Sequence, residues 1–127
     1  MDYTLEAFFD DKLIFHSSGK WLHPLFELED FLRQHNYDPA SLMVKDKIIG
    51  GAAALIHVYL GIRNVKANMM SQLGCDVFEI HRVQYEYEKL VPRIQCRTED
   101  MLKDELNPEH AYRLIKKLAN KNAKDNS

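Results

Sequence analysis

In the first quarter of the chain, the spacing of the hydrophobic residues changes from every second residue to the three- or four-residue spacing of a helix. Apolar and polar positions alternate over residues 3–9, and a second apolar run at residues 13–16 follows a polar turn. Alternation on both sides of a short turn predicts a β-hairpin. Farther on, leucines recur at helical spacing, which predicts an amphipathic helix of about three turns. These are Leu25, Leu28 and Leu32.

The rest of the chain alternates short apolar runs with helical patterns. Strands are predicted at residues 42–44, 65–69 and 85–91. Helices are predicted at residues 50–60, where nearly every position is apolar, after the potential cap Ser71, and after Asn107-Pro108. The order β-β-α-β-α-β-α-β-α predicts an α/β fold in three layers, a mixed five-stranded sheet with helices on both faces.

Composition and charge limit the classes of function. A chain of 127 residues with 46% hydrophobic and 28% charged residues predicts one globular domain over residues 1–127, with residues 107–127 as a final helix and polar tail. The net charge of −2 argues against a dedicated nucleic-acid binder. Two cysteines are too few for a disulfide scaffold, and neither a signal peptide nor a membrane-length apolar run is visible. We therefore expect a cytoplasmic protein with no membrane contact.

The most unusual local sequence leads from a strand into a helix made of small residues. Asp46 and Lys47 precede Gly50 and Gly51, which open a helix that continues with three alanines. Backbone N–H groups at such a helix start can hold a phosphate or carboxylate. Neither nucleotide-binding glycine fingerprint is matched. The alternative interpretation is that the small residues let a central helix approach the sheet closely.

Several short segments together carry a family resemblance. They are residues 23–25, 46–50, 52–54, 70–71 and 91–97. In order and spacing they resemble an uncharacterised bacterial family, a domain of unknown function with a cytidine-deaminase-like fold, over about residues 3–100. The resemblance implies a three-layer α/β/α fold. Together with the glycine-containing helix start, it suggests a ligand site formed by Asp46, Lys47, Gly50, Gly51, Ser71 and Arg97.

The zinc chemistry of true deaminases does not carry over. Those enzymes bind zinc through an H-x-E motif and a P-C-x-x-C motif at the starts of two helices. Here the two helix starts read Gly50-Gly51-Ala52 and Ser71-Gln72-Leu73. We therefore expect neither a metal site nor a cofactor.

The sequence is compatible with more than one kind of catalysed reaction. A divergent hydrolase or deaminase is one alternative, and thiol chemistry is another. Cys96 lies beside Arg93 and Arg97, which can lower the pKa of its thiol, whereas Cys75 fits a buried, inert cysteine better.

The leading hypothesis is a deaminase-like domain without zinc. It would bind a small anionic or nucleotide-like ligand near residues 46–51. The competing hypothesis is a homo-oligomeric interaction module that uses an edge strand and the last helix as contact surfaces.

Overall fold

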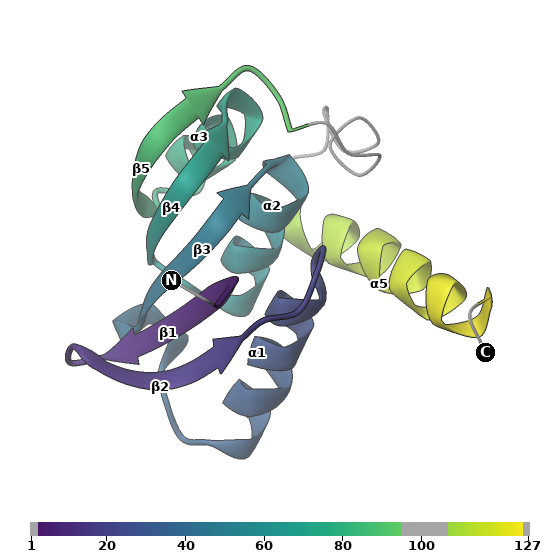
Figure 1. Cartoon of the computed structure of the whole chain (residues 1–127), viewed down its shortest axis with the longest axis horizontal. Coiled ribbons are helices and arrows are strands. Elements are labelled where there is room, and N and C mark those ends of the chain that lie inside the picture. Colours follow the sequence, from purple (N-terminus) through teal and green to yellow (C-terminus); the bar gives the residue numbers. More distant parts are fainter. Residues whose placement is uncertain (1–2, 95–106, 126–127) are drawn as a thin grey trace.

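The computed structural model describes residues 3–94 and 107–125, and the side chains of the last helix as far as residue 120. Its elements follow the predicted order (Figure 1). They are β1 (Leu5–Phe9), β2 (Lys12–Ser17), α1 (His23–Gln34), the short 3-10 helix η1 (Pro39–Ser41), β3 (Met43–Ile49), α2 (Gly51–Leu60), β4 (Asn64–Ser71), α3 (Gln72–Ile80), β5 (Gln84–Val91) and α5 (Pro108–Asp125).

The strands form one mixed sheet in the order β2-β1-β3-β4-β5. β1 runs antiparallel to both β2 and β3, and β3, β4 and β5 are parallel. The predicted α/β fold with a mixed five-stranded sheet is therefore confirmed. β3 is longer than the predicted residues 42–44 and continues through two lysines to Ile49. The sheet tolerates Lys45 because this side chain is only partly buried and lies over the Phe8 ring of β1.

The described helices lie on one side of the sheet, not on both. Each connection from β2 to β3, β4 and β5 moves across the sheet in the same direction. Right-handed crossovers then place α1, α2 and α3 on the same face (Figure 1). α5 packs against α2 and adds a layer outside the helices. The opposite face of β4 and β5 carries exposed polar side chains, namely Lys66, Asn68, Glu86 and Glu88.

The core lies between the sheet and the helices, and α2 is at its centre. Every residue from Gly51 to His57 is buried, because β3 and its neighbours cover one side of α2 and α5 covers the other. Gly61 ends α2 in the left-handed conformation (φ 88°), which glycine adopts without a steric penalty. Ile80, the last residue of α3, is 54% exposed.

α5 joins the core through its apolar stripe and one polar contact. The Asn107 side chain accepts a hydrogen bond from the backbone N–H of His110 at 3.1 Å, which confirms the predicted start. Ala111 and Ile115 are buried, and the Tyr112 hydroxyl donates to the buried Glu29 of α1 at 2.7 Å. Among the described helices, none is long and apolar enough to cross a membrane.

Candidate functional site

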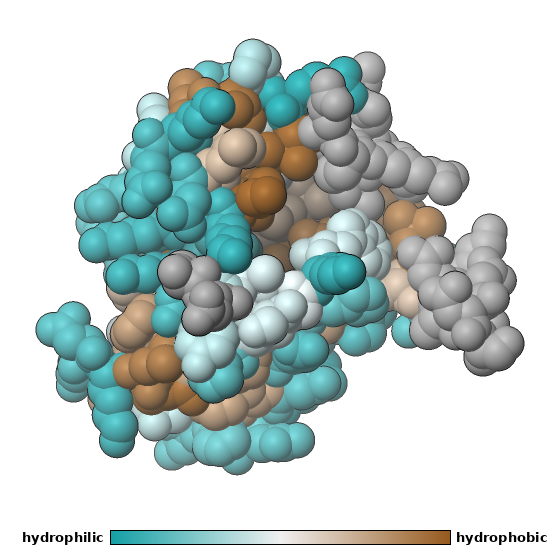
Figure 2. Space-filling view, in the orientation of Figure 1, coloured by the Kyte–Doolittle hydropathy of each residue, from teal (hydrophilic) through white to brown (hydrophobic). Residues whose placement is uncertain are grey.

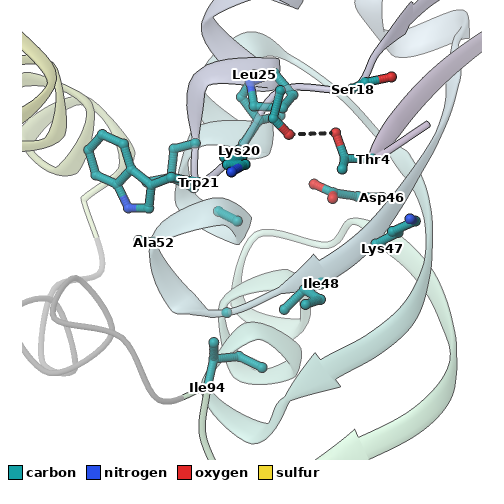
Figure 3. Close-up of a pocket in the computed structure, with 15 residues that line it drawn as sticks. Thr4, Ser18, Lys20, Trp21, Leu25, Asp46, Lys47, Ile48, Ala52 and Ile94 are labelled. Atoms are coloured by element: carbon teal, nitrogen blue, oxygen red, sulfur yellow. Dashed lines mark hydrogen bonds between the residues drawn. The ribbon is translucent and has the colours of Figure 1, made fainter. Parts of the chain in front are cut away.

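A cavity of about 470 Å³ opens at the carboxyl ends of β2 and β3. Its walls come from the segment between β2 and α1, the end of β3, the first turn of α2, and Thr4 just before β1 (Figure 3). β1 is antiparallel to its neighbours, so its first residue and not its last lies at this edge of the sheet, and no helix follows β1 there. A gap is therefore left between the starts of α1 and α2. Figure 2 shows hydrophobic side chains in a hollow framed by polar ones on this side of the molecule.

The first turn of α2 forms one wall of the cavity. Gly50, Ala52 and Ala53 line it, and the N-cap residue Gly50 has no side chain with which to cap the helix. The N–H groups of Ala52 and Ala53 have no acceptor inside the helix, since the first four N–H groups of a helix are left over. Together with the helix dipole they make this wall electropositive. Lys20 and Lys47, which also line the cavity, add positive charge.

Asp46 places a carboxyl group opposite this wall. It comes from β3, and its oxygens point into the space between Thr4, Lys20 and Ala52 in Figure 3. Its side chain is only 14% exposed. Burial raises the pKa of Asp46 to about 7, although hydrogen bonds from the backbone N–H groups of Ile48 and Lys47 act in the opposite direction. Near neutral pH this carboxyl group therefore holds its proton in a large fraction of molecules.

His57 stands behind Asp46 and is fully buried in α2. Its Nδ1 lies 2.7 Å from the carbonyl oxygen of Ala53, which can only accept, so Nδ1 carries the hydrogen. Nε2 is left as an acceptor, has no hydrogen-bond partner within the described residues, and lies 3.9 Å from Oδ2 of Asp46. Burial lowers the pKa of His57 to about 4, so the ring is neutral at neutral pH.

The segment between β2 and α1 is held over the cavity by Thr4. The Thr4 hydroxyl lies 3.0 Å from the carbonyl oxygen of Ser17 and 2.9 Å from that of Gly19. Two residues farther along, Trp21 adopts a positive φ of 57° and presents a partly exposed indole ring at the rim. The segment thus supplies an aromatic surface beside the polar groups of the cavity.

The structure brings together three of the six predicted ligand residues, since Asp46, Lys47 and Gly50 line the cavity. Gly51 is buried, and a Cβ atom at this position would lie 2.7 Å from Leu73 of α3, so its small size serves helix packing. This observation supports the packing interpretation of that glycine.

Ser71 does not line the cavity. Ser71 is fully buried, and its hydroxyl accepts a hydrogen bond from the N–H of Gly74 at 3.0 Å, which confirms it as the cap of α3. Its hydroxyl is therefore used inside the fold and not in the cavity. Arg97 and the candidate thiol Cys96 lie outside the described residues.

Cys75, the other thiol candidate, lies in α3 and is buried. Burial raises the pKa of its thiol, opposed in part by a hydrogen bond with Tyr85. Its thiolate, the nucleophilic form, is therefore disfavoured at neutral pH. Within residues 3–94 and the described part of α5, no group of three or more His, Cys, Asp and Glu side chains is placed to hold a metal ion.

Sequence reasoning did not assign Thr4, Lys20, Trp21 or His57 to this region. The signal for His57 is a single polar residue in an otherwise apolar helix, about two turns after the glycine pair. That pattern alone does not reveal the neighbouring carboxylate, because Asp46 comes from a strand. Pairing the two residues required the tertiary structure.

Comparisons with known proteins agree on the family. The model for a domain of unknown function, DUF1893, matches residues 2–118. A solved DUF1893 family protein from Thermotoga maritima has a similar structure, with a TM-score of 0.79 and 22% identity over 90% of this chain and 79% of that chain. No curated protein matches. The likeness of the fold to that of cytidine deaminases stays a prediction. The family match over nearly the whole chain shows that this protein belongs to the DUF1893 family.

Proposed function

We propose that the cavity at the start of α2 binds a small anionic or nucleotide-like molecule. The observation that carries this proposal is the coincidence of three features in one hollow: the start of α2, two lysines and the largely buried carboxyl group of Asp46. The volume of about 470 Å³ falls in the range of small-molecule sites, roughly 300–1,000 Å³.

The cavity walls suggest how such a ligand would lie. An anionic group would sit against the N–H groups of Ala52 and Ala53, where the helix dipole and a lysine favour negative charge. An apolar or planar part would lie against the hydrophobic wall that includes Leu22 and Ile48, with the Trp21 indole at the rim. The Asp46 carboxyl group can hydrogen-bond a polar group between these two ends.

Binding is favoured over deamination by the residues at the helix starts. α2 begins with Gly51 and Ala52, which carry neither a zinc ligand nor a proton-transferring carboxylate. α3 begins with Gln72 and Leu73, and its Cys75 is buried with a raised thiol pKa. These residues do not fit a zinc site of the deaminase type.

The proposal is tested by thermal unfolding with inorganic phosphate, AMP, CMP, adenosine and cytidine. A ligand present at about ten times its Kd stabilises the folded state by about 1.4 kcal/mol, which raises Tm by about 5 °C in a domain of this size. We expect phosphate or the nucleotides to raise Tm more than the uncharged nucleosides. Lys47→Ala should reduce the shift, and Lys12→Ala, at an exposed hairpin position away from the cavity, should not. No shift with any probe, or equal shifts in K47A and wild type, would contradict the proposal.

A second candidate function, self-association, is favoured by β5. This strand forms an edge of the sheet, and six of its eight residues are exposed, including the large apolar side chains Tyr87 and Leu90. An edge strand offers unpaired backbone groups to a second copy of the chain. Light scattering at tens of micromolar should then report a dimer or higher oligomer that Leu90→Lys weakens. A monomer at that concentration would exclude this candidate.

A further inference from the structure

The Asp46–His57 pair presents a problem for an anion site. An ionised carboxylate inside the cavity would repel a bound anion, and the low dielectric of the buried position strengthens that repulsion. Asp46 nevertheless lines the same cavity as the electropositive start of α2. An anion is therefore held more tightly when the carboxyl group is neutral than when it is ionised.

The geometry around Asp46 provides for a neutral carboxyl group. Nε2 of His57 is an acceptor, because Nδ1 carries the hydrogen that faces Ala53. It is fully buried, has no partner within the described residues and lies 3.9 Å from Oδ2 of Asp46. At this distance the two side chains are not hydrogen-bonded, so a protonated Asp46 keeps its O–H available for a ligand oxygen in the cavity.

Apart from Asp46, no described residue that lines the cavity carries a carboxyl or imidazole group that could take up this proton. The neighbouring strands place Leu5 of β1 and Ala67 of β4 beside Asp46. The other charged side chains that line the cavity in the described part of the chain are Lys20 and Lys47, whose ammonium groups favour an anion.

We infer that an anionic ligand enters this cavity together with one proton, which Asp46 holds beside His57. The inference deepens the proposed function and rests on it. The proton comes from the solvent and forms an O–H bond on the Asp46 carboxylate, and no other covalent bond is made or broken. The ligand class is small molecules whose anionic group has oxygens free to accept a hydrogen bond, such as sulfate, phosphate esters and carboxylates.

The pH dependence of binding follows from the position of the Asp46 titration. With a pKa of about 7, roughly nine tenths of the molecules hold the proton at pH 6 and roughly one tenth at pH 8. When only the protonated form binds, the apparent Kd rises about tenfold between these pH values. Asp46→Asn replaces the titrating group by an amide that can still donate a hydrogen bond, so its Kd should be the same at both pH values.

The experiment is titration calorimetry with sulfate, which does not itself titrate in this range. Measurements at pH 8 in two buffers of different ionisation enthalpy give the number of protons taken up per sulfate bound. We expect close to one proton for the wild type at pH 8, close to none at pH 6, and none for D46N. His57→Asn removes Nε2 and should alter the pH at which uptake is half complete, and far-UV circular dichroism checks that both variants fold.

The outcomes separate this inference from the proposed function. Sulfate binding without proton uptake, or uptake that persists in D46N, would overturn the inference and leave anion binding intact. Failure of sulfate, phosphate and the nucleotides to bind at all would overturn the proposed function and this inference with it. Asp30→Asn, at an exposed position on α1, is the matched control and should behave as the wild type.

Discussion

Replacing Asp46 and replacing His57 should change the pH dependence of the free energy of unfolding in opposite directions. The pKa of Asp46 is raised from 3.8 to about 7, so its contribution to folding is present below pH 3.8 and is lost as the pH rises toward 7. The pKa of His57 is lowered from 6.5 to about 4, so its contribution is present above pH 6.5 and is lost as the pH falls toward 4. Between about pH 4 and pH 6.5 the two side chains together hold one proton both in the folded and in the unfolded chain. The pH dependences that Asp46 and His57 give to the free energy of unfolding therefore cancel in the wild type.

The magnitudes follow from the free energy of about 1.4 kcal/mol that corresponds to each pKa unit. Asp46→Asn removes a shift of about three units, so D46N should gain stability relative to the wild type by about 4 kcal/mol between pH 4 and pH 7. His57→Asn removes a shift of about 2.5 units, so H57N should lose about 3 kcal/mol relative to the wild type between pH 4 and pH 6.5. The cavity left by the smaller side chain adds a constant penalty that does not depend on pH.

Urea denaturation monitored by far-UV circular dichroism at several pH values measures these differences. The quantity compared is the free energy of unfolding of each variant minus that of the wild type, plotted against pH. Asp30→Asn, on the surface of α1, serves as a control and should give a nearly flat difference curve. Two flat curves for D46N and H57N, or two curves of the same sign, would refute the assignment of a neutral carboxyl and a neutral imidazole to this pair.

Three further predictions concern packing and reactivity. Tyr112→Phe removes the hydrogen bond to the buried Glu29, and urea denaturation should show a loss of about 2 kcal/mol; an unchanged stability would mean that α5 is not held by this contact. Gly51→Ala places a methyl group against Leu73 and should cost about 1 kcal/mol, a penalty that shrinks in a G51A/L73A double-mutant cycle; strict additivity there would contradict the close approach of α2 and α3. Cys75 should react with iodoacetamide more slowly than free cysteine in a variant lacking the second cysteine, because burial raises its thiol pKa, and a faster reaction would count against that environment.

Much of the candidate site could be predicted where the relevant residues are close in sequence. The strand leading into a small-residue helix identified Asp46, Lys47 and Gly50, because a helix start and the strand before it are local features. The same pattern also included Gly51, whose neighbour Leu73 lies on another helix. A glycine that packs and a glycine that borders a ligand look alike in a sequence, and the contact with Leu73 distinguishes them.

The amino-acid sequence by itself determined the order of the elements and their local boundaries. Hydrophobic period, the Ser71 and Asn107 caps, and the glycine that ends α2 act within a few residues of the chain. The tertiary structure alone decided which side of the sheet the helices cover, because that side depends on the direction in which successive strands are added. It also decided that His57 of α2 stands behind Asp46 of β3, since a strand and a helix must pack before two such side chains can meet.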